Sequence, residues 1–314
     1  MLELRGKRIV ITGSSGFLGS WIIKELLSKG VRREDIALPV FPEYDLRSSE
    51  HCLRILKKGD IIIHLAARLG TVRDQQAHPG EFFLDNILIG TEMLEAARIS
   101  GAEKILLVGS INSYPAALTP PFREKNLWDG YPEKENASYG LAKRLLDVQS
   151  RAYRAQYGLS SVYVILPNLY GPGYDILKPS TFISLLVQKF FDANAAGEKT
   201  VFLQGTGSPS REFFYVEDAA RGLVEALCKY DNEEPLNMGS GDVVILRDLA
   251  ALIAEESGFS GEIKWDGKAL GPDAVRFLDS SRAKQEIGFV PKVGIQEGIR
   301  RTIAWYRKER AGVS

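Results

Sequence analysis

The feature that most constrains this chain is a glycine-rich turn near its beginning. Gly13, Gly16 and Gly19 follow a short β-branched run at residues 9–11 and precede apolar residues at helical spacing. A buried strand, a glycine turn and a helix in this order can hold the pyrophosphate of a dinucleotide, because the N–H groups of the first helical turn face the phosphates. We expect Gly13 to allow the tight turn, Gly16 to let the pyrophosphate approach, and Gly19 to let the helix lie close to the strand. The spacing G-x-x-G-x-x-G thus predicts dinucleotide binding, with a purely structural turn as the alternative.

Composition excludes several other classes of protein. The chain has 314 residues, with 40 Lys and Arg against 40 Asp and Glu, so bulk charge does not favour binding to nucleic acid or to a membrane surface. It has no apolar stretch of about 18 residues and no hydrophobic signal segment. Cys52 and Cys228 lie too far apart for a disulfide framework, and the histidines show no ligand spacing. We expect a cytoplasmic protein without a metal site.

Strand and helix patterns alternate along the first half of the chain. Strand patterns occupy 35–40, 60–65, 104–108 and 162–166, and helix patterns occupy 48–58, 82–100 and 139–157. Such alternation predicts an α/β fold with a Rossmann-type, doubly wound parallel sheet. Ligands of these sheets bind at the carboxyl ends of the strands.

The composition changes beyond Tyr170, where glycine and proline become frequent. The helix pattern at 218–229 suits the first domain again, and an amphipathic helix at 295–310 ends the chain. We therefore predict a second, smaller α/β domain made of two separate segments. The predicted division is 1–169 with about 213–258 for the dinucleotide-binding domain, and 170–212 with 259–314 for the second domain.

A tyrosine and a lysine four residues apart carry the predicted chemistry. Tyr139 and Lys143 lie on one face of a predicted helix, and the Lys143 ammonium should favour the Tyr139 phenolate and lower its pKa. Ser110, at the end of the strand pattern 104–108, could hydrogen-bond the same substrate oxygen. Beside a nicotinamide, these groups would reduce a carbonyl or oxidise an alcohol. Without the glycine turn, a buried tyrosine and a solvated lysine would be the better interpretation.

The order of motifs resembles the extended short-chain dehydrogenase/reductases, and among them the GDP-L-fucose synthase family. The likeness runs through TGSSGFLG, HLAARLG, PGEFFLDN, VGSINSYP, YGLAK, LPNLYGPG, GTGSPSREFFYVEDAA and NMGSG. It implies that Ser110, Tyr139 and Lys143 form a catalytic triad. It also implies contact with NAD or NADP for Gly13, Gly16, Phe17, Leu18, Gly19, Leu65, Ala66, Ala67, Tyr139, Lys143, Pro167, Asn168 and Leu169.

The same resemblance implies a nucleotide-sugar substrate bound in the second domain. Arg211 would bind the nucleotide diphosphate, because a guanidinium can form two hydrogen bonds to phosphate oxygens. Arg276 is a second candidate for this role, with a plain surface arginine as the alternative. A homodimer joined through the helices at 82–100 and 139–157 is also implied. The substrate contacts implied are Asn86, Asn112, Asn168, Arg211 and Arg276.

Two departures from that family bear on the reaction. The family epimerises its sugar with a cysteine and a histidine, and this chain has Asn112 and Thr181 at those positions. Neither side chain is an acid or base near neutral pH. We therefore expect that 3,5-epimerisation is lost and that a GDP-linked 4-keto sugar is reduced. A 4-epimerase that keeps its NAD bound and a cofactor-sensing regulator remain alternatives. Ile111 and Asn112 replace the Asp-Glu pair of dehydratases.

The choice between NAD and NADP stays open at this point. An acidic residue at the end of the second strand would bind the ribose of NAD, and an arginine there would suit NADP. The chain has neither at that position, since residues 39–42 read Pro-Val-Phe-Pro. Glu43 is a possible ribose ligand. Arg32 and Arg33 precede the strand and should be solvated.

Overall fold

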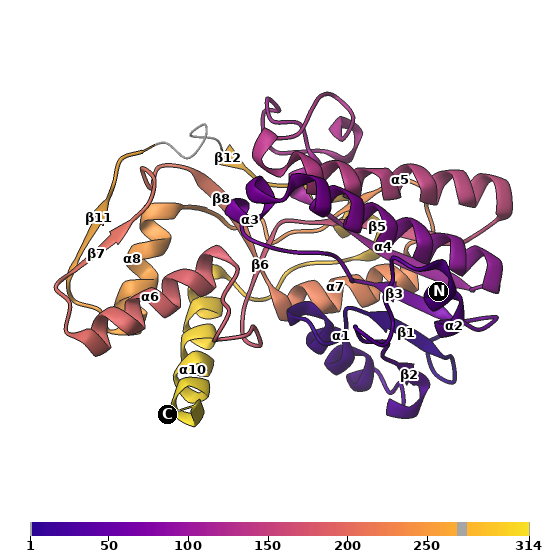
Figure 1. Ribbon diagram of the computed structural model, residues 1–314, viewed down its shortest axis with the longest axis horizontal. Helices are drawn as coiled ribbons and strands as arrows, with labels where there is room; N and C mark the ends of the chain where they lie inside the picture. The colour runs from indigo at the N-terminus through magenta and orange to yellow at the C-terminus, as the bar shows by residue number, and fades with distance from the viewer. Residues whose placement is uncertain (1, 269–274, 314) are drawn as a thin grey trace.

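A six-stranded parallel sheet forms the centre of the fold (Figure 1). The computed structural model describes residues 2–268 and 275–313. The strand order is β2-β1-β3-β4-β5-β9, which confirms the predicted doubly wound α/β fold. The strands are β1 (Ile9–Thr12), β2 (Ile36–Ala37), β3 (Ile61–His64), β4 (Lys104–Ser110), β5 (Ser161–Leu166) and β9 (Leu236–Asn237). Because the strand order reverses between β1 and β3, a crevice opens at their carboxyl ends.

Helices cover both faces of this sheet (Figure 1). One layer consists of α1 (Phe17–Ser28), α7 (Val216–Lys229) and α9 (Ser281–Ile287), and the other of α2 (Ser49–Ile55), α4 (Pro79–Ser100) and α5 (Ala137–Tyr157). Successive residues of a strand pack against opposite helix layers. Ile61 and Ile63 pack under α1 and α7, while Ile62 packs under α2 and α4. The strands read as unbroken apolar runs because both of their faces are buried.

A second cluster of buried residues lies beyond the carboxyl ends of the strands, at the left of Figure 1. Its helices are α6 (Phe182–Ala196), α8 (Leu246–Ser257) and α10 (Ile295–Val313). Its strands are β6 (Asn168–Tyr170), β7 (Thr200–Leu203), β8 (Ser210–Tyr215), β10 (Val243–Ile245), β11 (Glu262–Trp265) and β12 (Val275–Arg276).

A short helix, α3 (Val72–Ala77), precedes α4. Among the described helices, none is both long and apolar enough to cross a lipid bilayer.

The predicted domain boundaries stay a prediction, and the packing differs from them at two helices. As expected, α7 packs with α1 under the central sheet. However, α8 falls inside the predicted segment 213–258 and packs with α6 and α10. Conversely, α9 falls inside 259–314 and packs with α7. Each helix lies where its apolar face is covered, whatever its place in the sequence.

The ends of the elements follow local chemistry. Strand β2 has only two residues instead of the predicted 35–40, because Pro39 lacks the N–H that would continue the pairing. Helix α4 begins at Pro79, three residues before the predicted start, since proline is well suited to the first helical position. Ser48 caps α2, its hydroxyl accepting a hydrogen bond from the His51 N–H.

Candidate active site

The glycine turn lies at the crevice between β1 and β3. Gly13 has φ of 69°, in the left-handed region, and a Cβ there would lie 2.9 Å from the Ala66 nitrogen. A Cβ on Gly19 would lie 2.5 Å from the Gly13 carbonyl oxygen. The predicted tight turn and close helix approach are thus both present. Gly16 caps α1 without any side-chain hydrogen bond, which leaves the helix N-terminus facing the crevice.

A cavity of about 570 Å³ opens over this turn. The first turn of α1, a fully described helix, has no acidic side chain, so its positive end can receive an anion. The glycine cradle, the free helix end and the size of the cavity all fit part of a dinucleotide. The cavity is lined by Gly13, Ser15, Gly16, Pro39, Val40, Phe41, Tyr44, Asp45, Leu46, Arg47, Leu65, Ala66, Ala67, Arg68, Leu69, Asp85 and Ile89.

Most of the predicted cofactor contacts lie at these strand ends. Leu65, Ala66 and Ala67 line the cavity directly, and Phe17 and Leu18 form the first turn of α1. Pro167, Asn168 and Leu169 follow β5, and the Asn168 amide donates to the Glu212 carbonyl at 3.1 Å.

The charged residues that line the cavity after β2 differ from the one predicted. Glu43 is exposed and stands outside the described lining of the cavity, whereas Asp45 and Arg47 belong to it. Asp45 and Arg47 could not be predicted from the sequence, because they follow β2 by eight and ten positions, past a segment with two prolines.

The Asn86 side chain binds backbone groups of its own fold, and its predicted contact with substrate stays a prediction. Its side chain is buried on α4. The amide donates to the Arg68 and Phe82 carbonyls at 3.0 and 2.8 Å and accepts the Arg68 N–H at 2.9 Å. Asn86 therefore holds the backbone of Arg68, which lines the cofactor cavity.

Tyr139 and Lys143 lie on one face of α5, as predicted. The Lys143 nitrogen is 5.9 Å from the centre of the Tyr139 ring. The first turn of α5 packs tightly on the short helix η2 (Ile111–Ser113), where Ser113 donates to the Gly140 carbonyl at 3.0 Å. Gly140 has no Cβ, and one would collide with the Asn112 carbonyl oxygen. This contact brings Tyr139 to the segment that directly follows Ser110.

A buried framework supports this arrangement from behind. Tyr163 on β5 donates to the Lys143 carbonyl at 2.8 Å, and Gly109 leaves room for the Tyr163 ring. Arg144 is 3% exposed and donates to the Ser113 and Gly130 carbonyls, in each case at 3.0 Å. Arg144 was not predicted as a site residue, although its position next to Lys143 in the sequence could have indicated it.

The pKa values of the pair differ from the expectation. Burial raises the pKa of Tyr139 above its usual value and lowers the pKa of Lys143 to about 8. The expected lowering at Tyr139 is absent from this geometry, because removal from water penalises the charged form of each group. At neutral pH the pair is therefore a neutral tyrosine beside an ammonium.

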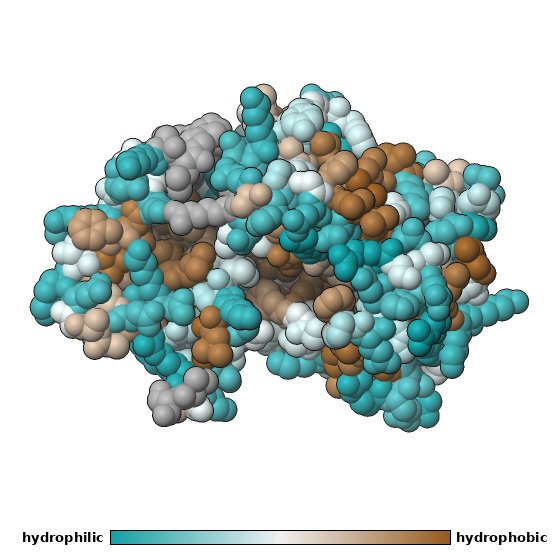
Figure 2. All heavy atoms as spheres, in the orientation of Figure 1, coloured by the Kyte–Doolittle hydropathy of each residue, from teal (hydrophilic) through white to brown (hydrophobic). Residues whose placement is uncertain are grey.

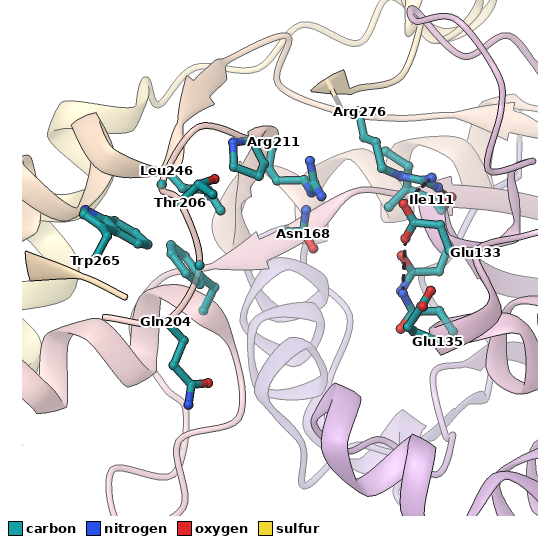
Figure 3. A pocket seen from close by; sticks show the side chains of 16 residues that line it. Ile111, Glu133, Glu135, Asn168, Gln204, Thr206, Arg211, Leu246, Trp265 and Arg276 are labelled. Carbon is teal, nitrogen blue, oxygen red and sulfur yellow. Dashed lines mark hydrogen bonds and ion pairs between the residues drawn. The ribbon is translucent and has the colours of Figure 1, made fainter. Parts of the chain in front are cut away.

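A second cavity, of about 320 Å³, lies between the central sheet and the second cluster (Figure 3). On one side are Ile111, Glu133, Glu135 and Arg276, and Asn112 also lines it. The opposite side is formed by Gln204, Thr206, Leu246 and Trp265, with Asn168 and Arg211 between the two sides.

Two arginines face this second cavity from neighbouring strands. Arg211 on β8 and Arg276 on β12 are direct partners in the ladder. Arg276 is 3% exposed, forms a 2.9 Å ion pair with Glu133 and donates to the Ile111 carbonyl at 3.1 Å, so it is not a plain surface arginine. Burial lowers the pKa of both arginines. Like charges directly opposite each other are destabilising, so this arrangement suits an anionic group such as a diphosphate.

The two positions that depart from the fucose synthase pattern offer no proton-transfer group. Asn112 lines the second cavity, and its amide side chain is neither an acid nor a base near neutral pH. Thr181 caps α6, and its hydroxyl accepts the Ser184 N–H at 3.3 Å in a reciprocal capping box. The Thr181 side chain is thus used to begin a helix.

Known proteins similar to this chain cover nearly all of it. The sequence profile of the NAD dependent epimerase/dehydratase family matches residues 9–239. A rice (Oryza sativa subsp. japonica) protein named probable GDP-L-fucose synthase 1 is 32% identical over 96% of this chain and 92% of its own length. GDP-L-fucose synthase 1 of Arabidopsis thaliana is 32% identical over 97% of this chain and 94% of its own length. The crystal structure of a GDP-6-OMe-4-keto-L-xylo-heptose reductase from C. jejuni superposes with a TM-score of 0.90 at 21% identity, covering 98% and 99% of the two chains.

The buried lysine should reduce the stability of the fold. Because the pKa of Lys143 is about 8 when folded and 10.5 ordinarily, the folded chain binds fewer protons than the unfolded chain between these values. Wild-type stability should therefore rise with pH across this range. We expect Lys143→Met to be more stable by about 1–3 kcal/mol at pH 7, an advantage that shrinks towards pH 10.5.

Urea unfolding at several pH values measures this difference. The exposed Lys134→Met is the matched control, with a change within about 0.5 kcal/mol. A Lys143→Met advantage that stays constant with pH would show that the buried charge is not its cause.

Proposed function

Because the chain belongs to the NAD dependent epimerase/dehydratase family, we propose that it reduces the 4-keto group of a nucleotide sugar with a nicotinamide dinucleotide. The bound cofactor would supply the hydride. The glycine turn Gly13–Gly19, the N-terminus of α1 and residues 65–67 would hold it.

One observation carries the proposal: α5 is packed on η2 so that Tyr139 and Lys143 lie beside the end of β4. In the proposed step the Tyr139 hydroxyl donates its proton to the ketone oxygen as hydride reaches the carbon. Ser110 would hydrogen-bond the same oxygen and orient it. The Lys143 ammonium would stabilise the phenolate that Tyr139 becomes. These residue roles are part of the proposal.

The substrate is proposed to be a GDP-linked 4-keto sugar. Arg211 and Arg276 would bind its diphosphate, and their burial strengthens such contacts because water does not compete. The cavity beyond Arg211 would receive the nucleoside, and the side with Asn112 would receive the sugar. The names of the two plant relatives and of the heptose reductase support this substrate class.

Tyr139→Phe should keep the fold and lose the reaction. Removal of the proton donor should lower kcat for a GDP-4-keto sugar by about 10²–10⁴-fold, measured as oxidation of the reduced cofactor. Tyr157→Phe, at the exposed end of the same helix, is the control and should keep its rate. A Tyr139→Phe rate within about threefold of wild type would refute the proposed role.

The same reaction run in deuterated water tests for loss of epimerisation. Since Asn112 and Thr181 cannot remove a proton near neutral pH, the product should carry no solvent deuterium at C3 or C5. Cofactor labelled with deuterium on the transferred position, used in ordinary water, should place that deuterium at C4 and shows that turnover occurred. Exchange at C3 or C5 as fast as turnover would contradict the expectation.

We also propose that the protein is a homodimer joined through α4 and α5. These helices pack side by side and leave Phe83, Leu84, Leu145 and Val148 exposed, at 38%, 56%, 40% and 48%. Figure 2 shows hydrophobic surface over α5. Apolar patches of this kind mark protein–protein interfaces.

Sedimentation should give the mass of two chains. Leu145→Glu combined with Val148→Glu should give a single chain, because a charge in a buried apolar interface is costly. Leu177→Glu, at a leucine outside α4 and α5 that is 71% exposed, should leave the dimer intact. A wild-type mass equal to one chain would contradict the dimer.

A cytoplasmic location is part of the proposal as well. Cys52 is buried and Cys228 is half-buried, and both are free thiols. Reducing compartments keep thiols in this state.

A further inference from the structure

The cavity over the glycine turn carries charges that the proposed reduction does not use. Its lining includes Arg47 and Arg68 together with Asp45 and Asp85. These side chains come from the segment after β2, the segment after β3 and helix α4. Their pairing bears on which dinucleotide the cavity accepts, and the inference therefore rests on the proposed function.

Arg47 is held by two carboxylates. Its Nε and Nη2 lie 2.9 and 2.7 Å from the two oxygens of Asp45, a bidentate pair. Its Nη1 lies 3.1 Å from Asp85 Oδ1. Hydrogen bonds from Arg47 in turn hold the pKa of Asp45 below its usual range. All three guanidinium nitrogens of Arg47 thus contact carboxylate oxygen.

Arg68 is neutralised in the same way. Its Nη1 lies 2.7 Å from Asp85 Oδ2 and its Nη2 lies 2.7 Å from Glu81 Oε2. Its backbone is fixed by Asn86, and its guanidinium lies 4.8 Å from the centre of the Phe82 ring. Asp85 therefore bridges Arg47 and Arg68, one oxygen to each.

The wall at the end of β2 adds no positive charge. It consists of Pro39, Val40 and Phe41, and among the described lining residues Arg47 and Arg68 are the cations. In this type of fold the adenosine ribose lies at the end of the second strand, where its 2′ position meets either an acid or an arginine. Here the 2′ position would face an apolar wall and arginines already paired with acids.

We propose that this cavity selects NAD(H) over NADP(H). A 2′-phosphate would bring about two further negative charges into the cavity that Asp45 and Asp85 line, and its binding to Arg47 would require a carboxylate to give up its hydrogen bonds. A 2′-hydroxyl adds no charge and can donate a hydrogen bond to a carboxylate oxygen. The network Asp45–Arg47–Asp85–Arg68 is the selecting element.

Isothermal titration calorimetry of the full chain with NADH and with NADPH tests the proposal without any turnover. NADH should bind at least about tenfold more tightly than NADPH. NADPH binding as tight as NADH, or tighter, would overturn the inference while leaving the proposed function intact. Failure of both to bind at millimolar concentration would overturn the proposed function itself.

Variants that remove a carboxylate partner of Arg47 test whether this network selects between NADH and NADPH. Asp45→Asn keeps the side-chain size but removes the charge, so NADPH should bind at least about fivefold more tightly while NADH changes less than about twofold. Adding Arg47→Met to Asp45→Asn should abolish this gain.

Asp35→Asn is the matched control. Asp35 forms a similar bidentate pair with Arg32, at 2.8 and 2.9 Å, outside the cavity lining. The variant makes the same change in net charge and should leave both affinities unchanged. If Asp45→Asn and Asp85→Asn fold, as thermal melting would show, and both leave the ratio of the two affinities unchanged, the inference is overturned.

Discussion

The packing of α5 on η2 is the contact on which the candidate active site depends. Gly140 lets the helix approach the Asn112 carbonyl, and Ser113 donates to the Gly140 carbonyl at 3.0 Å. Arg144 closes the same junction from the buried side. Because Tyr139 lies on the first turn of α5, Lys143 lies on the next turn and Ser110 immediately precedes η2, one helix-to-loop contact determines how the three groups meet. A larger residue at Gly140 would separate them.

Buried cations are the second theme of the structure. Burial lowers the pKa of Lys143, Arg211 and Arg276. Each of these buried cations therefore lowers the stability of the unliganded fold. Their chemistry explains why they are retained: an ammonium beside a tyrosine can stabilise a phenolate, and paired guanidinium groups can hold an anion. In the cofactor cavity, Arg47 and Arg68 are each paired with two carboxylates, whereas Arg276 pairs with the carboxylate of Glu133.

Long elements with a clear period were predictable from the sequence, and so was the glycine turn. Helices α4 and α5 lie within a few residues of their predicted ranges, because one apolar face repeats along each. The positions where prediction failed depend on distant partners. The pKa of Tyr139 rises through burial where a lysine was expected to lower it, and the contact of the Asn86 side chain with the Arg68 backbone was not predicted.

The sequence by itself determined the strand–glycine–helix unit, the parallel α/β fold and the residue types available for proton transfer, because these follow from local periodicity and local chemistry. The tertiary structure alone decided which of these residues meet. Asp45 and Arg47 reach the cofactor cavity past two prolines, and Asp85 joins them from a helix far along the chain. Charge pairing and desolvation depend on distance in space, and no pattern in the sequence encodes that distance.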